Sequence, residues 1–337
     1  MGMIAWVAVV GVLAVGCSGG ASLQTATFDN NTPLTVIDVI DGEAMRASFE
    51  GEGKLGDVSG PIRPVSIAPT RANGLLIADM ETRGILRIDG TNTVMASSVG
   101  PYVSRFNTRT APRFVRTDLA GNVYAVDGTN EEIYVYDQDL VAITNITPPY
   151  RALGLPQGQL TGLAFGGYGE MYVADRLNSR VYRFDASGVQ IGDFGSEEAP
   201  WARLNRPAGI ACDDYDGSVY VCDLGERRIV AYDNTGALLR TFGQADLREP
   251  VAVAIDRSGH VFVADYSRRA ILVYSREGEY LGLIDGPRLG FSEFGSPTDV
   301  AIRHGILHIA DLDNQRIIKV RYARQADESG NEEPTAE

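Results

Sequence analysis

Lysine is nearly absent from this chain of 337 residues, and basic residues are fewer than acidic ones. The two lysines are Lys54 and Lys319, and every other basic residue is an arginine. Asp and Glu number 44 against 30 Lys and Arg, which gives a net charge of −14. Binding to a phosphate backbone depends on clustered cations that displace counterions, so this composition argues against nucleic-acid binding. The arginine bias has two explanations: a GC-rich coding sequence, or side chains selected to grip carboxylates or sugars in a fork geometry.

Cysteine is also scarce, with three residues. An odd count in an exported protein indicates a free or modified thiol, and Cys17 stands apart from the other two. Cys212 and Cys222 lie in neighbouring expected strands, with Cys212 opposite Val219 and Cys222 near Gly209. Three strand positions then separate them, about 10 Å, which exceeds the reach of a disulfide. We expect two buried, unlinked thiols.

The N-terminal segment lacks charge. Residues 2–16 are apolar without interruption, and no Lys or Arg precedes Arg46. Such a run is short for a bilayer span but fits the core of a signal peptide. The stretch LAVGCSGG at residues 13–20 resembles a bacterial lipoprotein signal, which implies a lipid on Cys17, although Ala14 stands where leucine is usual. An uncleaved signal anchor and an ordinary export signal remain as alternatives.

We therefore expect a signal peptide at residues 1–16 and a flexible tether at residues 17–33. The mature protein would be exported to the bacterial cell envelope and held at a membrane by its lipid, on the periplasmic side or the outer surface. Residues 323–337 are acidic and contain Pro and Gly, which is typical of a disordered tail.

Six segments of the chain repeat one pattern: an apolar run, a turn bearing Gly or Asn, a β-rich run that ends in aspartate, and a further β run. The runs alternate and are rich in Val, Ile and Tyr, which is typical of strands that pack on a neighbouring sheet. Successive aspartates lie 48, 48, 48, 42 and 46 residues apart; they are Asp79, Asp127, Asp175, Asp223, Asp265 and Asp311.

Four short strands in each repeat predict an all-β, six-bladed β-propeller with four-stranded antiparallel blades. The last repeat ends near Tyr322 with three strands, whereas residues 34–40 form an orphan strand ahead of the first repeat. We expect this N-terminal strand to complete the sixth blade and close the ring, because an open arc would leave strand edges exposed. The propeller would then span residues 34–322.

The repeats resemble the NHL repeat, whose pattern P-x-G-I-A-x-D…G-x-V-Y-V-A-D-x-x-N-x-R-I-x-x-F-D covers nearly all of residues 62–320. Residues 162–195 and 209–243 match best, and the name-giving asparagine is present as Asn130, Asn178 and Asn314. The resemblance implies the fold far more firmly than the function, since one fold hosts many activities. It implies binding roles, RNA binding in some cytoplasmic members, and a few metal-dependent enzymes on related propellers.

The recurring aspartates and the histidines have structural explanations. Because an aspartate ends the second strand of every blade, we expect its carboxylate to accept backbone N–H groups of the following loop and to pair with the arginine five residues later; these arginines are Arg180, Arg228 and Arg316. His308 falls in a Tyr/Phe column, whereas His260 and His304 fall in turns. Metal ligands must converge on one point, so we expect no metal site, no catalytic residues and no cofactor, with a channel Ca²⁺ as the one possibility kept open.

The candidate binding site lies where a repeat column is broken. The first strand of each repeat carries a small residue at one position, and the second repeat has Arg116 there instead; the column is otherwise Ile67, Ala164, Ala211, Ala254 and Ala301. Such breaks concentrate at functional sites. Two interpretations stand: Arg116 faces a ligand in the channel, or it is a buried arginine satisfied by Asp299 or by backbone carbonyls.

We expect a ligand bearing a carboxylate or a glycan at the top face, where the first strands begin and the long connecting loops open. Arginine and aromatic residues are favoured at binding surfaces. The residues assigned to this site are Arg113, Arg116, Thr161, Trp201, Arg203, Arg206, Arg288, Phe291, Thr298 and Asp299.

These features predict a monomeric, non-catalytic scaffold that is anchored at a membrane surface and binds a protein, peptide or cell-wall glycan. The alternative is a hydrolase or lactonase with a divalent cation in the channel. Against it, the first strands carry no inward cluster of Glu, Asp, Asn and His apart from Asp299. The acidic charge and the export signal disfavour RNA as a partner.

Overall fold

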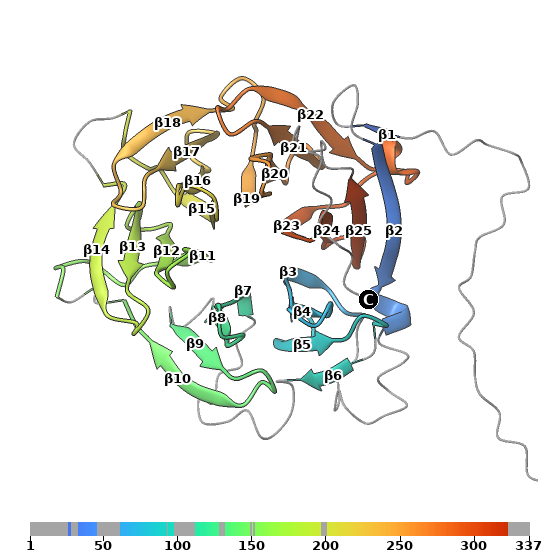
Figure 1. Cartoon of the computed structure of the whole chain (residues 1–337), viewed down its shortest axis with the longest axis horizontal. Helices are drawn as coiled ribbons and strands as arrows, with labels where there is room; N and C mark the ends of the chain where they lie inside the picture. Colours follow the sequence, from blue (N-terminus) through green and yellow to red (C-terminus); the bar gives the residue numbers. More distant parts are fainter. Residues whose placement is uncertain are drawn as a thin grey trace, which may run out of the picture.

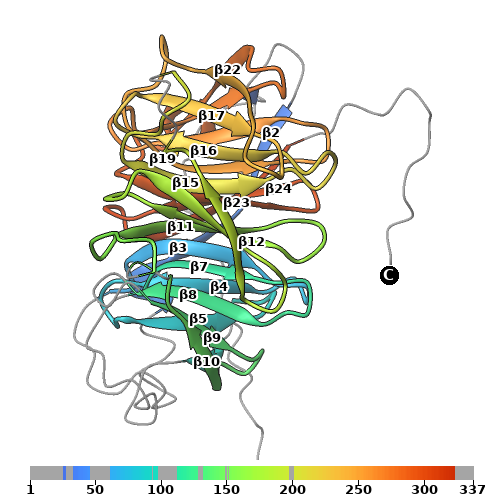
Figure 2. The ribbon, with the colours of Figure 1, turned by 90° about the vertical axis from the view of Figure 1, so that its left-hand side faces the viewer.

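The computed structural model describes residues 26–27, 33–45, 61–92, 94–97, 112–127, 132–148, 150, 152–196 and 201–322. Within these ranges the chain forms six antiparallel sheets arranged as blades around a central axis, seen end-on in Figure 1 and from the side in Figure 2. The predicted all-β, six-bladed propeller is therefore confirmed. The predicted signal peptide, Cys17, most of the tether and the acidic tail lie outside the described residues.

The innermost strand of each blade runs along the axis, and the second strand pairs with it (Figure 1). Innermost strands are β3 (Pro64–Pro69), β7 (Pro112–Thr117), β11 (Leu160–Phe165), β15 (Pro207–Cys212), β19 (Pro250–Ile255) and β23 (Pro297–Arg303). Second strands are β4 (Leu75–Asp79), β8 (Val123–Asp127), β12 (Met171–Asp175), β16 (Val219–Asp223), β20 (Val261–Asp265) and β24 (Ile306–Asp311). Every residue of β4, β12, β16 and β20 is buried, because both faces of these strands pack against neighbouring blades.

Third and fourth strands extend each blade outward to the rim. Third strands are β5 (Gly84–Ile88), β9 (Ile133–Tyr136), β13 (Arg180–Phe184), β17 (Arg228–Tyr232), β21 (Ala270–Tyr274) and β25 (Arg316–Tyr322). Fourth strands are β6 (Val94–Ser97), β10 (Ala142–Ile146), β14 (Gln190–Phe194), β18 (Leu238–Phe242) and β22 (Tyr280–Asp285). Among the residues that the structure describes, helix is confined to residues 42–45 and to the 3₁₀ turn η1 (Pro287–Leu289). In the described part of the chain, no helix combines the length and apolar character needed to cross a membrane.

The sixth blade is built from both ends of the propeller. Strand β2 (Pro33–Asp41) pairs antiparallel with β25, with Leu34 opposite Tyr322 and Ile40 opposite Ile317. The short β1 (Ala26–Thr27) pairs with β2 in turn. In Figure 1 the blue β2 lies outside the red β25 and takes the place of a fourth strand. The predicted closure by the N-terminal strand is thus confirmed.

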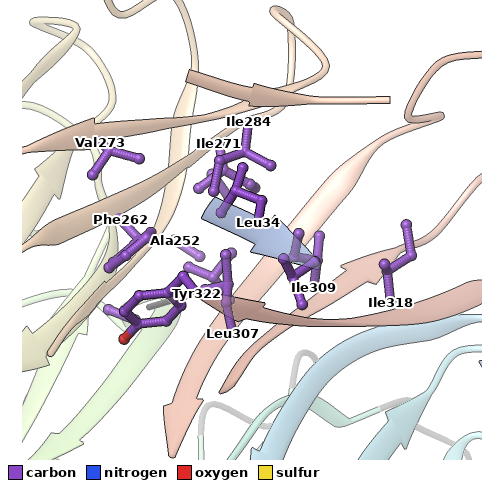
Figure 3. Packing of buried hydrophobic residues seen from close by; sticks show 14 of the residues in the cluster. Leu34, Ala252, Phe262, Ile271, Val273, Ile284, Leu307, Ile309, Ile318 and Tyr322 are labelled. Atoms are coloured by element: carbon purple, nitrogen blue, oxygen red, sulfur yellow. The ribbon is translucent and has the colours of Figure 1, made fainter. Parts of the chain in front are cut away.

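Hydrophobic cores lie between blades rather than within them. The described buried residues form six clusters, each shared by two adjacent blades. Figure 3 shows one of them, in which Leu34 of β2 lies beside Ile271 and Ile284 of the fifth blade. On the other side of the sixth blade, Ile40 of β2 joins the cluster shared with the first blade. Strand β2 therefore contributes to the packing on both sides of the sixth blade.

The repeating aspartates link the top of each blade together. Asp79, Asp175, Asp223, Asp265 and Asp311 are fully buried, and each accepts a backbone N–H from the residues just ahead of the innermost strand of its own blade. Asp79, Asp175 and Asp265 also accept a backbone N–H from the turn that follows. The expected structural role is therefore observed, and it extends to a segment 15 to 18 residues earlier in the chain. The side chain of Asp127 lies outside the described residues.

Two of the three expected arginine pairs form. Arg228 Nε lies 2.7 Å from Asp223 and Arg316 Nε lies 2.9 Å from Asp311. The third expectation was wrong, because Arg180 pairs with Asp193 on the adjacent strand at 2.6 Å. Asp175 is already occupied: its Oδ2 accepts the side chains of Asn178 at 2.7 Å and Tyr182 at 3.0 Å.

The strand register corrects one position of the small-residue column and confirms the expected position of Cys212. In the first blade Ala68, not Ile67, holds the small-residue position, because Ala68 pairs with Leu76 as Ala164 pairs with Tyr172. The expected position of Cys212 opposite Val219 is confirmed. Both described cysteines are free, Cys222 being buried and Cys212 only partly so.

Replacing Ile40 with alanine tests the closure. Ile40 is 5% exposed, so its truncation leaves a cavity and should lower the free energy of unfolding by about 2–5 kcal/mol. Ile37→Ala removes the same atoms from the same strand, but Ile37 is 36% exposed and its truncation should cost about 0.5 kcal/mol. Urea denaturation of both variants measures the difference, and equal losses would contradict a closing role for β2.

Candidate functional site

The channel has two ends, which we call the top and bottom faces. The top face is where the six innermost strands begin, and the bottom face is where they end and turn into the second strands. Arg113 is the second residue of β7, near the top, whereas Arg116 is the fifth. The register of β7 shifts between Pro112 and Phe114, at Arg113. Arg113 is exposed, whereas the Arg116 side chain is only 16% exposed. The structure therefore does not bring them together.

Arg116 of the second blade forms a bidentate ion pair with Asp299 of the sixth blade. Its Nη1 and Nη2 lie 2.9 Å from Oδ2 and Oδ1 of Asp299, which is fully buried. Nη1 also lies 2.8 Å from the carbonyl oxygen of Val115 and 3.1 Å from the hydroxyl of Ser66. The Arg116 side chain is 16% exposed. These contacts match the second interpretation of Arg116, a buried arginine satisfied by Asp299 and by carbonyl groups.

The same network joins three blades. Asp299 of the sixth blade accepts the hydroxyl of Ser66 at 2.6 Å and the backbone N–H of Ile67 at 2.9 Å, both in the first blade. Ser66 in turn accepts the backbone N–H of Val115 in the second blade at 3.2 Å. A bidentate arginine–carboxylate pair with every lone pair occupied is among the stronger polar contacts in proteins. It sits next to the junction where the ring closes.

Three more of the predicted site residues contact protein groups. Thr161 is buried and donates to the carbonyl of Pro207 in the next blade at 2.9 Å. The Thr298 hydroxyl lies 3.5 Å from the carbonyl of Pro64, also in the next blade. Phe291 is half-buried, and the Arg316 guanidinium stacks 4.4 Å from its ring centroid. Their contacts connect blades and loops.

The remaining candidates are exposed on the top face but are spread around the ring. Arg113 lies at the start of the second blade, and Arg288 lies between the fifth and sixth blades, where it donates to the carbonyl of Leu283. Trp201, Arg203 and Arg206 lie together in one loop between the third and fourth blades. Only this last group forms a local cluster.

The loop that carries Trp201 has a firmly held backbone. Arg228 donates to the carbonyls of Trp201 at 3.0 Å and Arg203 at 2.8 Å, while its Nε holds Asp223. The Tyr232 hydroxyl donates to the carbonyl of Ala202 at 3.0 Å. Leu204, within the same loop, is 1% exposed. The Trp201 ring is nevertheless 68% exposed, so an aromatic side chain stands in solvent on an ordered backbone.

The bottom face contains two adjoining cavities that the sequence analysis missed. One, of about 230 Å³, is lined by Arg116 and by the alanine column, Ala68, Ala164, Ala211, Ala254 and Ala301. The other, of about 180 Å³, is lined by Arg257, Arg303, His304 and the two acidic residues Asp214 and Asp256. The sequence feature that could have indicated these cavities is an arginine in or beside the first turn of repeats one, five and six, at Arg71, Arg257 and Arg303.

The three histidines are separate in the structure. His308 is buried opposite Ala301, where burial first and Lys319 second lower its pKa to about 4. His260 Nδ1 lies 2.9 Å from Asp256 in its own turn, and His304 is exposed at the bottom face. Over the ranges that the structure describes, no group of three or more His, Cys, Asp or Glu residues is placed to hold a metal ion.

Arg116→Ala should lower the free energy of unfolding by about 3–5 kcal/mol, because it leaves the Asp299 charge buried without its partner. Arg113→Ala, on the same strand but exposed, should cost about 0.5 kcal/mol. Combining Arg116→Ala with Asp299→Ala should cost less than Arg116→Ala alone, because no buried charge remains. Chemical denaturation of the wild type, Arg116→Ala, Asp299→Ala and the double variant measures the coupling, and strictly additive losses would contradict the pairing.

Comparison with known proteins places this geometry in a family. Residues 26–245 match the family described as "SMP-30/Gluconolactonase/LRE-like region". "NHL repeat-containing protein 2" of Gallus gallus is 38% identical over 79 residues, covering 21% of this chain and 11% of that protein. A Caenorhabditis elegans protein named "Probable peptidyl-alpha-hydroxyglycine alpha-amidating lyase" is 27% identical over 225 residues, covering 56% of this chain and 61% of that protein. The matches thus span less than two thirds of these relatives.

Solved structures show the same fold. A catalytically inactive variant of virginiamycin B lyase from Staphylococcus aureus, crystallised with quinupristin, aligns with a TM-score of 0.59 at 12% identity, covering 79% of this chain and 82% of that one. At this identity the likeness concerns the fold alone. The family match, in contrast, covers more than half of the chain. The blades of the chain are built from NHL-type repeats. The chain belongs to the SMP-30/gluconolactonase/LRE-like family of β-propellers.

Proposed function

We propose that this protein is a non-catalytic binding scaffold of the cell envelope, and that its top face receives a protein, peptide or cell-wall glycan. The observation that carries the proposal is the loop at residues 201–206, where Trp201 is 68% exposed above a backbone held by Arg228 and Tyr232. An exposed aromatic ring on a fixed backbone loses little conformational freedom when it binds. Aromatic and arginine side chains also dominate binding energy at interfaces.

Charge supports the choice of ligand. Arg203 and Arg206 are exposed beside Trp201 in a chain whose net charge is −14. Guanidinium groups recognise carboxylates in a bidentate manner and stack on flat surfaces, while aromatic rings cover the apolar face of a sugar or side chain. A carboxylate-bearing peptide or glycan satisfies both kinds of group at once.

An enzyme is the second candidate, favoured by the family description, which names gluconolactonase, and by the lyases among the similar proteins. A hydrolase or lactonase would use a divalent cation or an acid in the channel. The buried acid at the first strands is Asp299, whose oxygens accept Arg116, Ser66 and the backbone N–H of Ile67. Proton transfer by Asp299 would require these contacts to break, so the scaffold remains the function that the geometry supports better.

The scaffold would be anchored through a lipid on Cys17. Mass spectrometry of the N-terminal peptide of the membrane-extracted protein should find a diacylglyceryl adduct on Cys17. Cys17→Ser should move the protein from the membrane fraction to the soluble fraction, because an acyl chain contributes about 0.8 kcal/mol of membrane affinity for each buried CH₂ group. An unmodified Cys17 in membrane-bound protein would contradict this anchor.

Trp201→Ala tests the binding face. The immobilised protein is incubated with a detergent-solubilised envelope fraction and with soluble cell-wall glycan fragments. Trp201→Ala should reduce captured ligand about tenfold or more, as expected for an interface hot spot, and should keep the melting temperature because Arg228 and Tyr232 bind the loop through its carbonyls. Tyr168→Ala is the matched control: Tyr168 is 88% exposed and lies on the bottom face.

Capture that is unchanged by Trp201→Ala, or reduced equally by Tyr168→Ala, would contradict top-face binding. Mass spectrometry of the ligand recovered from the wild-type protein separates the two candidate functions in the same experiment. An intact ligand agrees with the scaffold, whereas a cleaved or rearranged ligand would favour the enzyme.

A further inference from the structure

Arginines from three blades converge at the bottom mouth of the channel. Arg303 ends β23 in the sixth blade, Arg257 lies in the β19–β20 turn of the fifth, and Arg71 lies in the β3–β4 turn of the first. Arg257 and Arg303 line the same cavity of about 180 Å³. These blades are neighbours in the closed ring, although Arg71 is far from the other two in the sequence.

The two cavity arginines have no carboxylate partner among the described residues, where ion pairs are formed by other arginines. The Nε of Arg303 is buried and has no hydrogen-bond acceptor. An unsatisfied buried donor is unfavourable. Arg71 donates to the carbonyl of Leu119 and contributes its charge from the side.

The acidic residues of the cavity, Asp214 and Asp256, form no ion pair with these two arginines. Asp256 accepts the backbone N–H of His260 and lies 2.9 Å from its Nδ1, so both of its oxygens are engaged within their own turn. Asp214 is exposed, and no ion pair joins it to Arg257 or Arg303 in the described structure. Burial, then Arg71 and Arg257, lower the pKa of Arg303. The bottom mouth therefore presents guanidinium groups that no carboxylate of the described chain engages in an ion pair.

The neighbouring cavity adds an apolar wall. The two cavities share Asp214, Ile255 and Ile302, so they adjoin. Beyond these residues the larger cavity is lined mostly by apolar side chains, among them the alanine column and Phe165, together with Arg116. A ligand that places an anionic group on the arginines can direct an apolar part toward these side chains.

We propose that Arg257 and Arg303, supported by Arg71, form a binding site for a carboxylate at the bottom mouth of the channel. The ligand is an organic acid whose carboxylate lies on the guanidinium groups and whose apolar part enters the alanine-lined channel. The site is independent of the top face, since its residues lie at the opposite ends of the innermost strands.

Carboxylates can reach the site from two sources. One source is a free acid, and the other is the chain itself. The last described residue, Tyr322, lies near the site, because its backbone N–H donates to the carbonyl of Gly305, next to His304, at 3.3 Å. The sequence that follows contains Asp327, Glu328, Glu332, Glu333 and Glu337. Both sources present the same chemistry to the arginines, and a shortened chain distinguishes them.

The test is a ligand-observed NMR titration of the full chain with benzoate, using benzamide as the neutral isostere at fixed ionic strength. Benzoate should bind and benzamide should not. Arg257→Gln and Arg303→Gln should each weaken benzoate binding about tenfold, the loss expected for one charge-assisted hydrogen bond. Arg248→Gln is the matched control, because Arg248 is exposed at the top of the same blade as Arg257. Arg257 is itself exposed, so its variant should fold normally.

A chain ending at Tyr322 identifies the source. Tighter benzoate binding than in the full chain shows that the acidic segment competes for the site, and equal binding shows that the ligand is an external acid. Three results would overturn the site: no benzoate binding by either chain, equal binding of benzoate and benzamide, or an equal effect of Arg257→Gln and Arg248→Gln. Trp201→Ala should leave benzoate binding unchanged, so this test and that of the top face fail or succeed separately.

Discussion

Each blade can bury its two faces only against its neighbours, and every other feature of the molecule depends on that constraint. The six hydrophobic clusters all lie between blades, so no blade has a core of its own among the residues that the structure describes. An open ring would leave two faces without partners. Strand β2 removes this problem because it extends the sixth blade beside β25 and supplies Leu34 to one side and Ile40 to the other. The packing of the sixth blade against both of its neighbours thus depends on the pairing of β2 with β25.

Polar residues follow the same constraint. The buried aspartates at the ends of the second strands hold the segments that enter each blade, and the pair of Arg116 with Asp299 binds the second blade to the sixth across the first. These charged groups are already hydrogen-bonded to other parts of the protein. A charged residue near the axis is therefore a poor indicator of a ligand site here. The informative residues are those whose polar groups find no protein partner, such as Arg303 Nε, or whose rings stand in solvent, such as Trp201.

The two faces consequently offer different chemistry. The top face presents an aromatic ring and two arginines on a loop whose backbone is fixed by Arg228. The bottom face presents Arg257 and Arg303 beside an alanine-lined channel. Strands about 20 Å long, the length expected for six residues in β conformation, separate the two surfaces. A rigid ring can therefore carry two sites that bind independently.

The sequence by itself determined the repeat, and with it the six blades and their closure, because regularly spaced aspartates and a missing fourth strand follow from local patterns. It misplaced Ile67 for Ala68, although Ala68 follows the first residue of its strand, Pro64, by four positions, as Arg116 follows Pro112. It left two partners open for Arg116 and missed the three bottom-face arginines. Only the tertiary structure decided these, because closing the ring brings Arg116 to Asp299, 183 residues away, and places the first blade next to the sixth. Contacts between blades depend on ring geometry, which local sequence patterns do not encode.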